Sequence, residues 1–91
     1  MRALIVNDPF ATWIVQGKKS REYRTQPTNI RERIGIIKSG SKTIIGEVDL
    51  IDCVGDPFSV SGFAWILENP VEYIEPLFYK HPRGAQTWVK L

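Results

Sequence analysis

The chain has 91 residues, of which 43% are hydrophobic and 24% are charged, and its formal net charge is +2. This length fits one domain, residues 1–91, and leaves no room for a second. The single cysteine, Cys53, excludes an intrachain disulfide, and no apolar run is long enough for a signal peptide or a membrane span, which predicts a cytoplasmic protein with no membrane partner.

The chain is predicted to begin with a strand that leads into a helix. Residues 2–6, "RALIV", are apolar after the first position and read as the strand. Asn7 or Asp8 is expected to cap the helix, and Pro9 fits its first turn, where the missing N–H is not needed. Gly17 is expected to end the helix in a left-handed conformation. The predicted apolar face of this helix consists of Phe10, Trp13 and Ile14.

Residues 20–25, "SREYRT", alternate in a way that predicts the second strand. Successive side chains of a strand point to opposite faces. Glu22 and Arg24 therefore share one face, and Arg21 and Tyr23 share the other.

The middle of the chain predicts a β-hairpin. Residues 33–39 and 43–54 read as strands, and the turn residues 40–42 join them. Gly46, inside the longer strand, indicates a bulge or a close approach of another backbone.

The last third of the chain is predicted to contain a short helix and a closing strand. Residues 63–69, "FAWILEN", read as a helix that ends at Asn69–Pro70. Residues 71–76 are extended or a short strand, and residues 84–91 form the closing strand. About five strands and two short helices predict an α+β domain with a small barrel-like sheet, mixed or antiparallel.

The charge is distributed unevenly along the chain. Between Gly17 and Arg33 there are six basic and two acidic residues, a local net charge of +4, which leaves −2 for the rest. Such a segment favours an anionic partner, most simply one that carries phosphate. A solubilising surface is the alternative.

The stretch from Gly17 to Arg24 combines three groups that can carry chemistry. Lys19 falls at the turn after the helix, and Glu22 and Arg24 follow on one strand face. A carboxylate among cations can orient them or accept hydrogen bonds from a ligand, and the cations can hold a phosphate or a polarised carbonyl. Lys19 is also a candidate general base. A surface ion-pair cluster is the structural alternative.

These residues resemble a known signature. "GKKSREYR" is similar to G-x-K-x-x-E-x-R of the ASCH domain, a relative of the PUA domain, and "NDPFATWIVQGKK" resembles the family's opening helix. "RERIGIIKSG" and "IIGEVDLIDC" resemble its central strands, and "FAWILENPVEYIEP" and "GAQTWVKL" its late segments. The resemblance covers nearly the whole chain.

The resemblance implies a PUA-like fold, a small β-barrel with a helix beside a cleft that is proposed to bind RNA. Some members of the family are reported to be amidohydrolases acting on N4-acetylated cytidine, and others ribonucleases. Lys19, Glu22 and Arg24 match the signature positions. The family's "RG" pair stands here as Arg31-Glu32, and Arg31 is expected to face the cleft. Lys38 stands near a position where many relatives have histidine and is expected to make the cleft more cationic, which favours an anionic ligand.

The aromatic residues, the histidine and the cysteine are further candidates for the site. Trp13 could stack a base at the cleft mouth, although core packing against Phe10 is favoured. Trp65 and Trp88 are expected in the core, and His81 on the surface. One histidine and one cysteine do not make a metal site, and no cofactor is predicted.

Three hypotheses follow from the sequence. The first is an RNA- or modified-nucleoside-binding domain. In it Lys19, Arg24 and Arg31 hold phosphate or a base carbonyl, and Glu22 orients Lys19 and accepts a hydrogen bond from a base amino group. The second is a small amidohydrolase acting on an N4-acylated cytidine, or a ribonuclease, with Lys19 as catalytic base and Glu22 as its partner. The third is a module that docks an acidic protein. The sequence does not indicate an oligomeric state.

Overall fold

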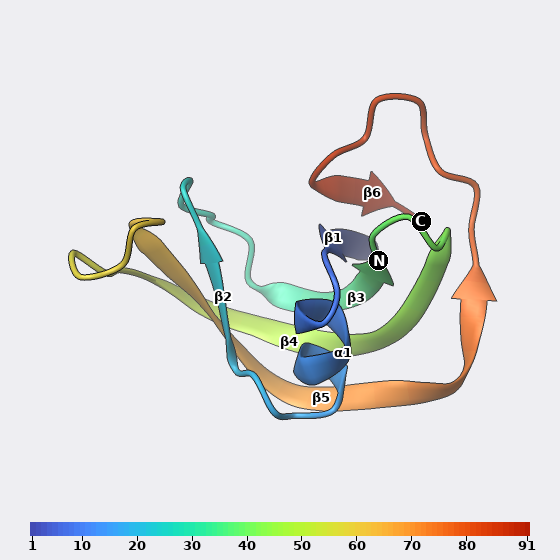
Figure 1. The fold of residues 1–91 in the computed structure, drawn as a ribbon, viewed down its shortest axis with the longest axis horizontal. Coiled ribbons are helices and arrows are strands. Elements are labelled where there is room, and N and C mark those ends of the chain that lie inside the picture. The colour runs from blue at the N-terminus through green and yellow to red at the C-terminus, as the bar shows by residue number, and fades with distance from the viewer.

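The computed structural model describes all residues, 1–91, and shows a strongly curved sheet with one helix in its hollow (Figure 1). The elements are β1 (Arg2–Val6), α1 (Phe10–Val15), β2 (Arg21–Arg24), β3 (Glu32–Lys38), β4 (Thr43–Gly55), β5 (Phe63–Phe78) and β6 (Trp88–Lys90). The strand order is β2-β5-β4-β3-β1-β6. β1 and β3 run parallel and all other neighbours are antiparallel, so the sheet is mixed.

The number of helices and strands differs from the prediction. There is one helix instead of two and there are six strands instead of five, because residues 63–69 lie in β5. This segment pairs with β4 on one side and with β2 on the other. A short apolar run fits a buried strand as well as a buried helix, and here pairing on both sides decides for the strand. Asn69, at φ 54, makes an irregularity within β5 and does not end a helix.

The core lies between α1 and the concave face of the sheet. It contains Leu4, Val6, Ala11, Ile14, Val15, Ile34, Ile36, Val48, Leu50, Trp65 and Leu67. The predicted helix face is wrong in part, since Ala11, Ile14 and Val15 are buried whereas Phe10 and Trp13 are 45% and 41% exposed. Both sets have the same helical spacing. The face with Ala11 is the one that packs on the sheet, because its small side chain lets the helix approach the sheet closely.

Two glycines are required by this packing. Gly17 has φ +78 and ends α1 in the left-handed conformation, as predicted. Gly46 in β4 lies against β5 and α1: a Cβ there would overlap the Val71 carbonyl oxygen and stand 2.7 Å from Cγ1 of Val15. The close backbone approach predicted at Gly46 is therefore confirmed.

Trp65 and Trp88 lie near one edge of the core. Trp65 is 3% exposed, and its indole N–H donates to the Gln26 carbonyl oxygen at 3.0 Å. Trp88 is half-buried and stacks on Trp65 with ring centroids 5.9 Å apart. No helix of the structure has the length and apolar character needed to cross a membrane.

Candidate functional site

A pocket of about 690 Å³ opens where β1, the start of α1 and β2 meet. Lys19, Glu22 and Arg24 all contribute to its wall, so the three side chains singled out in the sequence line one concave site. Its full lining is Ile5, Val6, Asn7, Phe10, Lys19, Glu22, Tyr23, Arg24, Ser39, Ser61 and Gln86.

The chain reaches this pocket through a tight turn after α1. Gly17 reverses the chain, and the backbone N–H groups of Lys18 and Lys19 both donate to the Trp13 carbonyl oxygen, at 2.8 and 3.2 Å. Lys18 is exposed, whereas Lys19 is half-buried at the pocket. The turn thus separates two neighbouring lysines into a surface residue and a pocket residue.

Glu22 and Arg24 form an ion pair on the pocket wall. Nε of Arg24 donates to Oε2 of Glu22 at 3.0 Å, and Nη2 of Arg24 lies 2.8 Å from the same oxygen. Nη2 also donates to the Ile5 carbonyl oxygen at 2.9 Å, which ties β2 to β1. Glu22 is the one charged residue in the buried set, at 7% exposure, and Arg24 compensates its charge.

The second carboxylate oxygen of Glu22 has no hydrogen-bond partner in the protein. No buried side-chain oxygen or nitrogen lacks a partner, so this Oε1 atom is accessible, and Glu22 lines the pocket. Because an ionised carboxylate only accepts, the pocket offers an acceptor to a ligand N–H or O–H group at this point.

Lys19 is held by aromatic rings and not by Glu22. Its Nζ lies 5.3 Å from the ring centroid of Phe10 and 4.9 Å from that of Tyr23. No carboxylate lies within ion-pairing distance of this ammonium. The expectation that Glu22 orients Lys19 is therefore wrong: Glu22 orients Arg24, and the Lys19 charge is available to an anion.

Three residues that were predicted for the site lie outside the pocket. Trp13 stands on the exposed side of α1 and contacts Phe10 edge-on, with ring centroids 5.7 Å apart. Arg31 donates to the carbonyl oxygens of Thr28 and Ile30, at 2.9 and 2.8 Å, in an exposed loop. These contacts hold both side chains away from the pocket wall, because each is already engaged by its own segment of the chain.

Lys38 is the third of these residues. Its Nζ pairs with Asp8 Oδ2 at 3.5 Å, next to Ser39 of the pocket wall. Asp8 also accepts from the hydroxyl and backbone N–H of Thr12, at 2.7 and 3.1 Å. The Thr12 hydroxyl, more than Lys38, holds the pKa of the Asp8 carboxyl below its usual range. Lys38 is thus linked through Asp8 to the first turn of α1 and does not line the pocket.

Sequence reasoning missed the aromatic and neutral parts of the wall. Strand alternation puts Tyr23 on the face opposite Glu22, yet both line the pocket, and β2 is an edge strand of the sheet. Ser39 and Gln86 come from turns whose positions depend on the whole sheet, and no local pattern marks them. No cluster of three or more His, Cys, Asp or Glu side chains suited to a metal ion exists in the structure.

The chain is similar to known proteins in both sequence and fold. The sequence model of the ASCH domain matches residues 4–78. Among solved structures, an ASCH protein from Zymomonas mobilis is similar, with 20% identity and a TM-score of 0.75 over 99% of this chain and 86% of the other. Two mutant forms of that protein give 21% and 22% identity, TM-scores of 0.74 and 0.76, and coverage of 99% of this chain and 88% and 87% of theirs. A search of curated proteins found no match.

Proposed function

This chain belongs to the ASCH domain family, and from its pocket we propose that it binds single-stranded RNA or a modified nucleoside. The observation that carries the proposal is the convergence of Lys19, Glu22 and Arg24 on one concave wall. A charged triad splayed into solvent would offer no binding site. A pocket of about 690 Å³ falls within the range of small-molecule sites, about 300–1,000 Å³.

Lys19 supplies the anion-binding group of this proposal. Its ammonium has no carboxylate partner and is fixed between the rings of Phe10 and Tyr23. The Glu22–Arg24 pair is neutral as a unit, so the charge of the pocket is that of Lys19. A phosphate or a polarised base carbonyl is the ligand group that complements it.

Glu22 and the aromatic rings supply base recognition. The free Oε1 atom of Glu22 accepts a hydrogen bond from an exocyclic amino group, such as that of cytosine or adenine. Phe10 and Tyr23 offer ring surface at the same wall, and bases stack on such rings in single-stranded RNA sites. A pocket that takes an unpaired base selects single strands over duplexes.

The proposal is tested by titrating labelled single-stranded RNA at two salt concentrations against wild type, Lys19→Ala and Lys18→Ala. Lys18 is the matched control, because it is the neighbouring lysine and does not line the pocket. Lys19→Ala should weaken binding and lower the salt slope, since one phosphate contact on a single strand accounts for a slope of about 0.7. Binding that is absent, or equally affected by both substitutions, would reject the proposal.

A small hydrolase acting on an N4-acylated cytidine is the second candidate, with Lys19 activating the water that attacks the amide. It is favoured by one observation: the Lys19 Nζ and the Glu22 carboxylate line the same pocket without being paired to each other. Incubation with N4-acetylcytidine, with cytidine as the measured product, separates the two functions. Turnover by wild type that is lost in Lys19→Ala would establish catalysis. The absence of turnover at high enzyme concentration would reject the hydrolase function.

A further inference from the structure

A second pocket, of about 340 Å³, adjoins the first. The two share Ile5, Ser39 and Gln86 in their linings, so they are direct neighbours, and together they are called the groove below. The rest of the second pocket comes from the end of β3, the β3–β4 turn and the segment between β5 and β6. These residues are Ile37, Gly40, Lys42, Tyr79, His81 and Ala85.

Tyr79 and His81 form a fixed aromatic wall in the second pocket. The Tyr79 hydroxyl lies 2.7 Å from Nδ1 of His81, and Nε2 of His81 lies 3.0 Å from the Ala85 carbonyl oxygen. Since a carbonyl only accepts, Nε2 carries the proton, and in the neutral ring Nδ1 accepts from the Tyr79 hydroxyl. Both rings are therefore held before a ligand arrives, with centroids 5.7 Å apart at an interplanar angle of 61°.

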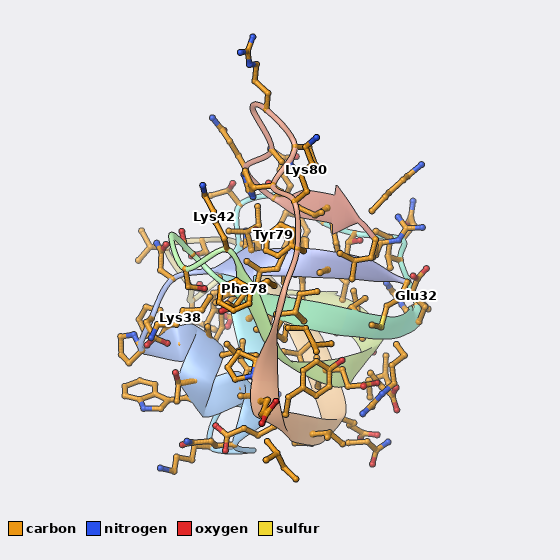
Figure 2. All side chains as sticks on the ribbon, turned by 90° about the vertical axis from the view of Figure 1, so that its right-hand side faces the viewer. Glu32, Lys38, Lys42, Phe78, Tyr79 and Lys80 are labelled. Carbon is orange, nitrogen blue, oxygen red and sulfur yellow. The ribbon has the colours of Figure 1, made fainter.

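Lys42 supplies a free cation at the same pocket. It lies in the β3–β4 turn with φ 56, its side chain is exposed, and no carboxylate pairs with it. Figure 2 shows Lys42 beside Tyr79, with Lys80 on the same side of the molecule and the acidic Glu32 at the far edge of the view. A free ammonium beside aromatic rings is the combination that single-stranded nucleic acids require.

The electrostatics of the whole groove favour an anionic chain. Glu22 is the sole acidic side chain in the linings of the two pockets, and Arg24 neutralises it. These linings contain two lysines, Lys19 in the first pocket and Lys42 in the second, and neither is in an ion pair. A ligand with regularly spaced negative charges fits this arrangement, whereas a single nucleoside fills only one pocket.

We propose that the second pocket is a second nucleotide subsite, so that the ligand is an RNA strand that spans both pockets. The aromatic pair of Tyr79 and His81 stacks one base, and Lys42 binds the phosphate that links it to the nucleotide in the first pocket. Ser39 and Gln86 lie along the strand between the two subsites. This inference rests on the proposed function and adds that the ligand is at least two nucleotides long.

Calorimetric titrations with a mixed-sequence RNA tetranucleotide and with cytidine 5′-monophosphate test this subsite. The variants are Lys19→Ala in the first pocket, Lys42→Asn and His81→Ala in the second and, as a control that removes one exposed positive charge outside both pockets, Lys90→Gln. Asparagine is chosen at position 42 because it tolerates positive φ. Circular dichroism of each variant confirms that it is folded.

The tetranucleotide should bind wild type at least about tenfold more tightly than the monophosphate, because a second base stacks and a second phosphate is neutralised. Lys42→Asn and His81→Ala should each weaken tetranucleotide binding about fivefold and leave monophosphate binding unchanged, as the loss of one contact or one stack implies. Lys90→Gln should change neither.

The outcomes separate this inference from the function on which it rests. If Lys19→Ala weakens tetranucleotide binding while Lys42→Asn and His81→Ala match the Lys90→Gln control, the second subsite is refuted and the first pocket stands. If wild type binds neither ligand, both proposals are refuted.

Discussion

Replacing Arg24 by alanine tests how the candidate site is held together. Arg24 donates to Glu22 and to the Ile5 carbonyl oxygen, and its guanidinium carbon lies 5.6 Å from the ring centroid of Trp65. Its removal leaves a carboxylate that is 7% exposed without its counter-charge and a backbone carbonyl without its donor. Water entering from the pocket restores part of this loss.

The expected cost follows from these two abandoned groups. A buried acceptor left without a partner costs about 1–3 kcal/mol. Two of them, partly rehydrated, imply that Arg24→Ala lowers the free energy of unfolding by about 2–4 kcal/mol. For a domain of this size that is a fall in Tm on the order of 10–20 °C.

Urea denaturation followed by tryptophan fluorescence measures this cost. Arg21→Ala is the matched control, because Arg21 is exposed on the opposite face of the same strand, and it should change stability by less than about 0.5 kcal/mol. A double-mutant cycle with Glu22→Gln should give a coupling energy of about 1–2 kcal/mol. Equal effects of Arg24→Ala and Arg21→Ala, or a coupling near zero, would refute the assignment of Arg24 as the partner of Glu22.

Two further predictions concern the sheet that carries the site. Gly46→Ala should destabilise the fold by about 1–3 kcal/mol in the same urea assay, because its Cβ would overlap the Val71 carbonyl oxygen; an unchanged midpoint would contradict this packing. Glu47 accepts from Arg33 at 2.6 Å, and this hydrogen bond lowers the pKa of Glu47 from its ordinary value of 4.5. A depressed folded pKa gives stability that is present above pH 4.5 and is lost as the pH falls through the folded value, so Arg33→Met should flatten the fall in stability below pH 4.5, and an unchanged pH profile would refute it.

The positions of Gly17, Glu22 and Arg24 could be predicted from the sequence because they depend on short-range rules. Gly17 had to end the helix, and strand alternation placed Glu22 and Arg24 on one face. The burial of Glu22 and its pairing with Arg24 agree with that alternation.

What the sequence did not predict depends on contacts between distant segments. Residues 63–69 are a strand because β2 and β4 flank them, which no local pattern reports. The two rings that contact the Lys19 ammonium come from different elements, Phe10 from α1 and Tyr23 from β2. Arg31 lies outside the pocket because it donates to carbonyl groups of its own loop. A short apolar run can form a helix or a strand, and an exposed cation can pair with several neighbours. Only the contacts made in the complete sheet determine which of these occurs.

The central claim is that the pocket lined by Lys19, Glu22 and Arg24 is the RNA-binding surface. A two-dimensional NMR titration of the labelled protein with a short single-stranded RNA tests it most directly. The largest shift changes should fall on Lys19, Glu22, Tyr23 and Arg24, and Arg33 and Asp49, which lie outside the pocket, should not move. Shift changes centred on Arg33 and Asp49, or none at saturating RNA, would contradict the claim.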